Sequence, residues 1–589
     1  MPEHFIAGKD ASLETSIARM QSKLDELGFH LDERSWLNSI NDIWSVHLVD
    51  QDCPLLFSNG KGASKLAARA SALGEFVERL STNHFWNSYY LGKEFATDHH
   101  CIHHPREQWF EFDNADIDGW AQELLTPELQ KLYNPDNAIS SQTLVDHNSG
   151  NTERGICALP FTSLSDNTTV WFPVNIISNL YVSNGISAGN SREEARAQAL
   201  AEIVERHIKF RIIREGLCLP DIPEEVIARY PQLAADIHEL RTAGFGVLIK
   251  DASLGGHYPV VCVALLNPHD QGCYASFGSH PRFEIALERS LSELLQGRSL
   301  DALNGFSEPS FDLDEVASIP NLEAHFIDSS GIIHWNFFDN SADFDFADWT
   351  STASTHEDYA RLVELILDEG YDIYVTDYSH LGMYACRIIV PGMSEIYPID
   401  DLEYENNSFG NTIREQILAL SDLDDDECES LLDTLNDSNI DEQRLVAALI
   451  GLAPDAGSFW EELRVGELKT LLALAIADEE ATREGCHWIR HFGQINPERL
   501  RVYRCIETLL NLSDTGTSSG FDNYRSALEH LFSLPTLNRA IALLVREERF
   551  FNIPPLGVNL EDCQMHQRLL CSYRKVHTQH EAEALHHGS

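Results

Sequence analysis

Two segments of the chain repeat one pattern, and this repeat constrains the fold more than any other feature of the sequence. Residues 62–79 (GASKLAARASALGEFVER) and residues 189–206 (GNSREEARAQALAEIVER) are identical at eleven of eighteen positions, and both end in Glu-x-x-Glu-Arg. Ser-Asn-Gly precedes each copy, and a weaker third copy at residues 285–293 keeps the same alanine, leucine and first glutamate. The repeat predicts three related helices, whose convergence would gather their carboxylates.

Helical geometry places the carboxylates of each copy on one face. Residues four and seven apart share a face of an α-helix, and Glu75 and Glu78 follow Ser71 at these spacings. The second copy repeats this arrangement with Glu202 and Glu205. The opposite face of each copy is apolar or rich in alanine, so we expect each helix to pack by that side.

The alternative to a ligand site is a set of ordinary ion pairs on helix surfaces. A glutamate four residues from an arginine, as Glu293 is from Arg289, commonly forms a solvated pair worth about 0.3–0.5 kcal/mol. Surface pairs have no reason to recur in register after glycine-rich lead-ins, which favours a site. Mg²⁺ binds carboxylate and phosphate oxygens, so glutamates beside arginines predict a site for a magnesium-bound polyphosphate.

The common nucleotide-binding motifs are absent from the sequence. No G-x-x-x-x-G-K-[ST] occurs, and residues 60–65 (GKGASK) have the wrong spacing for a P-loop. The protein-kinase motifs are missing as well. The predicted nucleotide site is therefore of an uncommon type.

Charge, cysteine content and hydropathy limit the function classes. The net charge of −51 disfavours direct nucleic-acid binding, and a solubility or salt adaptation is the favoured explanation of the charge itself. The twelve cysteines are scattered and form no C-x-x-C, which fits free thiols in a reducing compartment. There is neither a signal-peptide pattern nor an apolar run of about twenty residues. We expect a cytoplasmic protein without membrane contact.

Strands and helices alternate up to about residue 410, and helices dominate beyond it. This pattern predicts an α+β (mixed α/β) domain at residues 1–410 and an all-α domain at residues 411–589. The expected elements of the first domain are a helix within 1–27, strands at 46–49, 55–57, within 159–182, at 247–251, 260–266, 371–376 and 387–391, and helices at 283–299 and 358–368.

The C-terminal domain follows an acidic run at residues 422–427, interpreted as a solvated helix start or a linker. Its helical stretches are similar to tetratricopeptide pairs, although their period is irregular. They lie near residues 439–452, 460–476, 480–492, 497–512 and 521–533. The domain is expected to serve self-association or partner docking, or else to cap the first domain.

The three copies resemble the three ATP-binding motifs of the YcaO family. The matching patterns are S-x-x-x-E-x-x-E-R, E-x-x-x-Q-x-x-x-E-x-x-E-R and R-x-x-x-E. The resemblance extends along the whole chain, from residues 6–10 (IAGKD) through residues 386–394 (CRIIVPGMS) into the helical tail. It is strongest to the stand-alone enterobacterial type, and it implies glutamate helices that converge on ATP and more than one Mg²⁺.

The resemblance also implies roles for individual residues. The ATP-binding residues would be Lys9, Ser16, Ser187, Asn190, Glu194, Arg206 and Arg289, the two arginines at the phosphates. The magnesium ligands would be Glu75, Glu78, Glu202, Glu205 and Glu293. No catalytic acid, base or nucleophile is identified.

The chemistry implied by the family is ATP-dependent activation of an amide, whose phosphorylated oxygen becomes a good leaving group. Azoline-forming members end in P-x-P-x-P, whereas this chain ends in EALHHGS, so azoline formation is not expected. The stand-alone type is associated with β-methylthiolation of an aspartate in a small-subunit ribosomal protein, as accessory factor to a radical-SAM methylthiotransferase. The chain lacks C-x-x-x-C-x-x-C for the cluster of that enzyme, so it would assist.

Two principal hypotheses remain from the sequence. The first is an ATP- and Mg²⁺-dependent enzyme that phosphorylates an amide or carboxyl group during ribosomal protein modification. The second is a non-catalytic scaffold, gated by nucleotide, that brings the methylthiotransferase to its target. A metal hydrolase with a non-nucleotide substrate is a third. The apolar faces of the helical tail and the family resemblance also predict a homodimer.

Two further features are interpreted as structural. Residues 98–104 (DHHCIHH) contain possible zinc ligands, but adjacent residues rarely face one ion, and Pro105 indicates an exposed loop. Cys157, beside Gly155, is interpreted as a buried structural thiol rather than a nucleophile.

Overall fold

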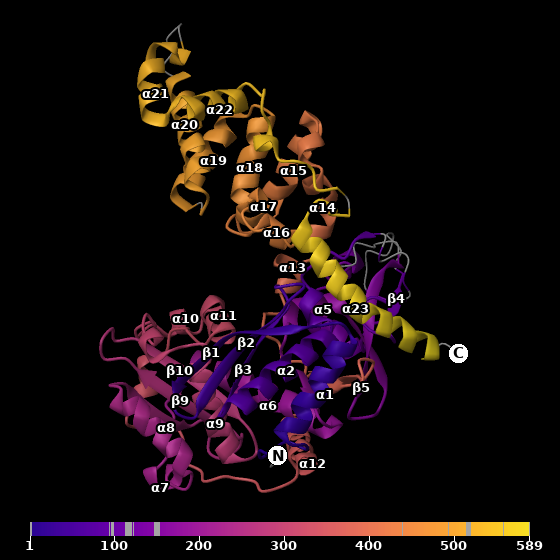
Figure 1. Cartoon of the computed structure of the whole chain (residues 1–589), viewed down its shortest axis with the longest axis vertical. Helices are drawn as coiled ribbons and strands as arrows, with labels where there is room; N and C mark the ends of the chain where they lie inside the picture. The colour runs from indigo at the N-terminus through magenta and orange to yellow at the C-terminus, as the bar shows by residue number, and fades with distance from the viewer. Residues whose placement is uncertain are drawn as a thin grey trace.

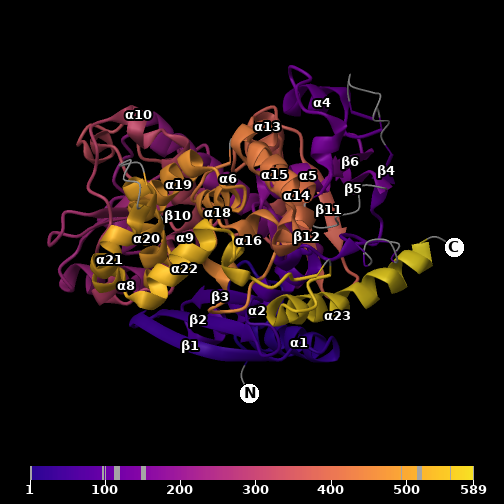
Figure 2. The same cartoon turned by 90° about the horizontal axis from the view of Figure 1, so that it is seen from above.

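The computed structural model describes residues 3–587 except for 94, 96–98, 100, 112–119, 122, 147–153, 439, 493, 514–519 and 558. Figure 1 shows a body of sheets and helices from which an elongated arm of helices extends, and the last helix of the chain runs back from the arm along the body. In Figure 2 the first strands and the first helix lie along one edge of the molecule, as does that last helix. Among the described residues, no helix is both long and apolar enough to cross a membrane.

Three antiparallel sheets form the body. The strands are β1 (Leu31–Ile40), β2 (Ile43–Asp50), β3 (Phe57–Gly62), β4 (Gln108–Phe110), β5 (Ile156–Ser163), β6 (Thr169–Pro173), β7 (Ile186–Gly189), β8 (Gly246–Asp251), β9 (Val260–Leu266), β10 (Cys273–Ser279), β11 (Tyr374–Tyr378) and β12 (Tyr384–Ile389). The sheet orders are β1-β2-β3, β10-β9-β8 and β4-β5-β11-β12-β7, with β6 paired to β5. Every pairing between these strands is antiparallel. The prediction of a mixed α/β region with a helical C-terminal part is confirmed.

Helices pack on these sheets. They are α1 (Leu13–Glu26), α2 (Lys65–Ser81), α4 (Pro127–Tyr133), α5 (Val174–Ile176), α6 (Arg192–Glu215), α7 (Glu224–Ile227), α8 (Pro231–Thr242), α9 (Phe283–Leu295), α10 (Leu313–Val316), α11 (Ile319–Ile327), α12 (Thr355–Asp368) and α13 (Asp401–Tyr404). Helices α2, α6 and α9 are the three copies of the repeat, and each follows a strand closely. Ser64 and Ser191 cap the first two by accepting from the backbone N–H of Ala67 and Glu194.

Most predicted elements of the body differ from the observed ones only at their ends, but the strand structure expected up to residue 182 stops at Pro173, and residues 174–181 are helical. The N-terminal helix begins only at Leu13, after the Ser12 cap. The strand expected at 55–57 instead starts at Phe57 and continues through the Ser-Asn-Gly lead-in to Gly62. The lead-in is therefore strand rather than loop, which brings the following helix directly onto the sheet.

The arm is built of helices in the part that the structure describes. These are α14 (Phe409–Leu418), α15 (Asp425–Asp437), α16 (Val446–Leu449), α17 (Phe459–Glu462), α18 (Val465–Ala475), α19 (Glu479–Phe492), α20 (Pro497–Ser513), α21 (Arg525–Phe532) and α22 (Leu534–Leu544). The acidic run starts α15, where Asp424 and Glu427 form a capping box. The helix expected at 439–452 is mostly irregular and retains only α16. One continuous hydrophobic cluster joins α14 to α22.

Helix α23 (Gln564–His587) belongs to the core of the body although it ends the chain (Figure 1). Leu569, Tyr573 and Val576 are buried in the same hydrophobic cluster as Leu80 of α2 and Trp86. This long-range packing fastens the arm to the body at both of its ends.

Candidate functional site

In the first and third copies of the repeat, a glycine lets the helix fold back tightly onto the strand before it. A Cβ atom on Gly60 of β3 would lie 2.0 Å from the carbonyl oxygen of Ala68, and one on Gly278 of β10 would lie 2.3 Å from that of Ala286. No side chain fits at such distances. Because Ala68 and Ala286 occupy equivalent positions, the sequence builds the same strand–helix unit twice.

The three repeat helices converge on one cavity of about 1150 Å³. Parts of β1, β2, β3, β7 and β10, the N-terminal segment and residues 325–329 also line it. All twelve residues that the sequence suggested as ligand-binding line this cavity: Lys9, Ser16, Glu75, Glu78, Ser187, Asn190, Glu194, Glu202, Glu205, Arg206, Arg289 and Glu293. The structure thus brings the predicted site together, while the ligand roles of the individual residues stay predictions.

At one end of the cavity, the N-terminal segment is bound to the start of α6. Glu194 is almost fully buried and receives the ammonium of Lys9 at 3.3 Å and the backbone N–H of Asp10 at 2.8 Å. Asn190 donates to Glu194 at 3.0 Å and accepts from the Ser16 hydroxyl at 2.9 Å. This network links residues 174 or more positions apart, so it positions four of the predicted ATP-binding side chains rigidly.

At the other end, the predicted metal ligands lie among basic side chains. Glu75 pairs with Arg79 at 2.5 Å, and Glu202 pairs with Arg206 at 3.0 Å. Glu205 accepts the backbone N–H of Ser279 at 3.0 Å. Glu293 is paired with Lys61, and Arg289 donates to the Ser279 carbonyl at 2.8 Å and to Gln198.

The carboxylates repel one another despite these basic neighbours. Burial raises the pKa of Glu78 well above its ordinary value, and the nearby charges of Glu202 and Glu75 raise it further. Burial likewise raises the pKa of Glu75 and Glu205. Added cations would relieve this repulsion, which is the electrostatic condition that a magnesium site provides.

The same place also offers a donor to an anion. The Nη1 atom of Arg206 is buried and has no hydrogen-bond partner among the described residues. The Arg206 guanidinium lies 4.6 Å from the centroid of the Phe326 ring, which covers one of its faces. A buried guanidinium N–H without an acceptor fits a phosphate oxygen, so the donor set suits a polyphosphate with its cations.

The predicted metal ligands line one cavity, but they are not arranged around a common point. In the part of the chain that the structure describes, no group of three or more His, Cys, Asp and Glu side chains is placed to hold one ion. Glu75 and Glu202 are turned toward arginines of their own helices, and Glu293 is turned toward Lys61. The carboxylates must leave these partners to share a cation.

Two lysines of this cavity were missed by sequence reasoning. Lys61 lies in the glycine-rich lead-in, which was considered only as a failed P-loop. Lys209 follows Arg206 by one turn of α6, is buried, and donates to the Ser329 hydroxyl at 2.6 Å and to the His325 carbonyl. Its position on the carboxylate face of the repeat helix was the signal that could have identified it.

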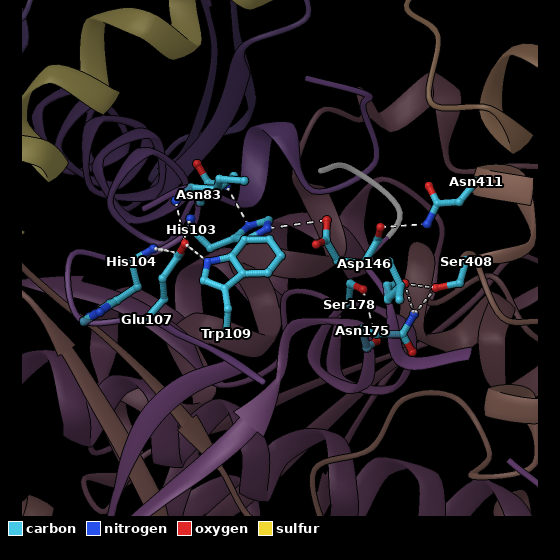
Figure 3. A network of polar contacts seen from close by, with 12 residues as sticks. Asn83, His103, His104, Glu107, Trp109, Asp146, Asn175, Ser178, Ser408 and Asn411 are labelled. Atoms are coloured by element: carbon cyan, nitrogen blue, oxygen red, sulfur yellow. Dashed lines mark hydrogen bonds and ion pairs between the residues drawn. The ribbon is translucent and has the colours of Figure 1, made fainter. Parts of the chain in front are cut away.

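The expectation that the histidine-rich segment is an exposed loop is wrong. Residues 101–104 are buried, as is Pro105, and His99 is half-buried; Asp98 and His100 lie outside the described residues. Glu107 makes burial possible because its carboxylate accepts the backbone N–H groups of three consecutive residues, at 2.8, 2.7 and 3.0 Å, and the Trp109 indole (Figure 3).

This segment anchors α23 to the body. Its backbone carbonyls accept from Tyr573 at 2.6 Å and from His577 at 2.7 Å. His103 meets Asn83 at 3.2 Å and Asp146 at 3.6 Å (Figure 3). These contacts give His103 and the backbone beside it an architectural role, which the sequence interpretation favoured for the segment.

Cys157 on β5 is fully buried. Burial raises the pKa of its thiol well above the ordinary value, which disfavours the thiolate that a nucleophile needs. The interpretation as a buried structural thiol is confirmed.

Family comparisons agree with the resemblance read from the repeat. Residues 59–394 match the model of the YcaO cyclodehydratase domain, described as ATP- and Mg²⁺-binding, and residues 410–582 match the YcaO cyclodehydratase C-terminal domain. The first match includes all three repeat helices, and the second covers the arm and most of α23.

Two relatives match the chain over nearly its whole length. The chain is 47% identical to the ribosomal protein S12 methylthiotransferase accessory factor YcaO of Escherichia coli (strain K12), over 98% of each chain. It is 45% identical to an uncharacterized protein of Haemophilus influenzae, over 97% of this chain and 98% of that one. The structure of YcaO from Methanopyrus kandleri bound with AMPPCP and Mg²⁺ aligns at 18% identity with a TM-score of 0.40, over 65% of this chain and 92% of that one. The family matches and the two full-length relatives establish that the chain belongs to the YcaO family.

Proposed function

We propose that the chain binds ATP and Mg²⁺ in the cavity between α2, α6 and α9. The observation that carries this proposal is the meeting of mutually repelling carboxylates with the buried, unpartnered Nη1 of Arg206 in one cavity. Each feature leaves an interaction unsatisfied in the ligand-free protein, whereas a polyphosphate with bound cations satisfies both. The description of the matching family as ATP- and Mg²⁺-binding supports the same ligands.

The residues divide into two groups in this proposal. Glu75, Glu78, Glu202, Glu205 and Glu293 hold the magnesium ions, and Arg206 and Arg289 bind phosphate oxygens. The network of Lys9, Ser16, Asn190 and Glu194, with Ser187 beside it, positions the rest of the nucleotide. Bound magnesium would neutralise charge that develops on the transferred phosphoryl group.

The function that fits this site best is ATP-dependent phosphorylation of an amide or carboxyl group in support of ribosomal protein methylthiolation. The name of the E. coli relative supports an accessory role toward the S12 methylthiotransferase. A ribosomal protein substrate would also place the chain in the cytoplasm. The protein therefore acts together with a radical-SAM methylthiotransferase and a small-subunit ribosomal protein.

Nucleotide binding and phosphate release test this function. Glu75→Ala and Arg206→Ala should each weaken binding of Mg²⁺-ATP by tenfold or more and abolish phosphate release stimulated by ribosomal protein and methylthiotransferase. Arg211→Ala is the matched control, because Arg211 lies on the same helix in an exposed pair with Glu215. Equal nucleotide affinity in all three variants and the wild type would exclude this cavity as the ATP site.

The elongated arm favours a second candidate, a nucleotide-gated scaffold (Figure 1). Phe492, Leu531, Leu534 and Val545 are exposed on the arm, by 60%, 74%, 48% and 58%, and they offer apolar surface for self-association or for a partner. ATP binding without phosphate release above background, in the presence of ribosomal protein and methylthiotransferase, would select this function over the enzyme.

We infer that the same arm carries the predicted homodimer contact. Truncation near residue 410 is unsuitable as a test, because it removes α23 and opens the core of the body. Leu531→Asp leaves the core intact and should convert dimers to monomers in light scattering. A dimer that persists in this variant places the contact elsewhere.

A further inference from the structure

Lys61 forms an ion pair between two of the repeat units. It lies on β3, opposite Ser45 of β2, and its ammonium pairs with the carboxylate of Glu293 on α9. The pairs of Glu75 with Arg79 and of Glu202 with Arg206 are each confined to one helix. Lys61 therefore joins the first unit to the third, across the cavity.

The ammonium of Lys61 also lies among the other carboxylates. Burial lowers the pKa of Lys61 to about 8, whereas the charges of Glu205, Glu75 and Glu202 favour its ammonium and that of Arg289 opposes it. Lys61 itself lines the cavity. A positive charge thus already stands within the cluster whose mutual repulsion calls for a cation.

We propose that Lys61 is a resident counter-ion, which holds Glu293 until a magnesium ion replaces it and which then pairs with the phosphates of the nucleotide. This inference rests on the proposed function of the cavity. It assigns to Lys61 a role in exchanging one cation for another, and none of the recognised motif residues has that role.

The chemistry of the two cations supports such an exchange. Both an ammonium and Mg²⁺ bind carboxylate oxygens, so a carboxylate that holds Lys61 is hindered from joining a metal. The pair is partly exposed, 26% at Lys61 and 39% at Glu293, and partly exposed ion pairs are weak enough for a divalent cation to displace. A lysine is also a compact charge on a flexible stem, which suits relocation.

The inference predicts effects of opposite sign from one substitution. Lys61→Met removes the competitor for Glu293, so binding of Mn²⁺ alone should tighten about three- to fivefold, the equivalent of one partly exposed ion pair. The same variant loses a cation for the phosphates, so binding of AMPPCP at saturating Mg²⁺ should weaken about tenfold. A lysine that only stabilised the fold would weaken both.

Manganese titration followed by electron paramagnetic resonance, and calorimetry with AMPPCP, measure the two effects on the full chain. Lys65→Met is the control, because it makes the same charge change four residues away. The Lys65 ammonium lies 4.7 Å from the Trp44 ring centroid, outside the cavity lining. It should change neither affinity. Lys61→Gln, which keeps a polar end, provides a second variant if Lys61→Met folds poorly.

A double-substitution cycle assigns the effect to Glu293. With Glu293→Gln already present, Lys61→Met should no longer tighten Mn²⁺ binding, because the competed carboxylate is gone. If the wild type binds both probes and Lys61→Met leaves Mn²⁺ affinity unchanged or weaker, the counter-ion role is wrong although the site stands. If the wild type binds neither Mn²⁺ nor AMPPCP, the proposed function itself fails.

Discussion

Two buried carboxylate environments of this molecule differ in how they are balanced, and the difference separates architecture from ligand binding. In the arm, Glu467 is fully buried and accepts from the Tyr503 hydroxyl at 2.8 Å and from Arg499 at 3.1 Å. In the cavity, Glu78 lies beside the like charges of Glu202 and Glu75. Burial raises the pKa of Glu467 and of Glu78. Their neighbours, rather than the direction of the pKa shift, therefore distinguish the two environments.

The largest effect on stability is expected in the arm. Glu467→Ala removes the buried charge partner of Arg499, which keeps only the partly exposed Glu462 at 3.4 Å, so the free energy of unfolding should fall by about 3–5 kcal/mol. Urea denaturation monitored by circular dichroism measures the loss. Glu529→Ala breaks an exposed pair with Arg525 and should change stability by less than about 1 kcal/mol. Similar losses of stability in both variants would refute the distinction between the buried ion pair of Glu467 and the exposed ion pair of Glu529.

A substitution of a cavity carboxylate should instead weaken ligand binding and leave stability unchanged. Glu205→Gln keeps an oxygen to accept the Ser279 N–H and removes one of the repelling charges. We expect Mg²⁺ binding to weaken by about 10- to 100-fold, while the ligand-free protein loses no stability in urea denaturation. A destabilisation as large as that of Glu467→Ala would mean that the cavity carboxylates are structural.

A buried histidine of α23, His566, lies where the arm meets the body, and its contribution to stability depends on pH. Burial lowers the pKa of His566 to about 4, and the neutral ring accepts the Ala453 N–H at 3.0 Å and donates to the Tyr90 carbonyl at 2.7 Å. The unfolded chain binds the proton more readily, so this contribution is complete above about pH 6.5 and is lost toward pH 4.

Between pH 7 and pH 5, the loss from this one group should be about 2 kcal/mol. The measurement is the difference in free energy of unfolding between the wild type and His566→Gln at the two pH values, which cancels the titration of the other groups. A wild type that keeps its advantage at pH 5 would show that His566 accepts a proton without losing its contacts.

The site was predictable from the repeat, because the positions of its carboxylates depend on residue spacing within a single helix. The spacing of Glu75 and Glu78 follows from helical geometry, and Gly60 marks the close strand–helix approach that recurs at Gly278. Lys61 was not predicted, because its partner Glu293 lies more than two hundred residues away and no local period connects them.

The other incorrect predictions concern segments that are buried by contacts with distant parts of the chain. Pro105 suggested an exposed loop, whereas Glu107 satisfies the local backbone and lets the segment be buried under α23. Nothing local distinguishes Tyr573 from residues of the arm, although its hydroxyl donates to the Ile102 carbonyl. The sequence pattern therefore identified most helices and the carboxylates that line the cavity, but not which distant helix completes which core.

A crystal structure of the full chain with AMPPCP and Mg²⁺ tests the central claim most directly. We predict magnesium ions against carboxylates of α2, α6 and α9, phosphate oxygens at Arg206, and Glu293 released from Lys61. Nucleotide bound away from these three helices, with the carboxylates still paired to Arg79, Arg206 and Lys61, would contradict the account.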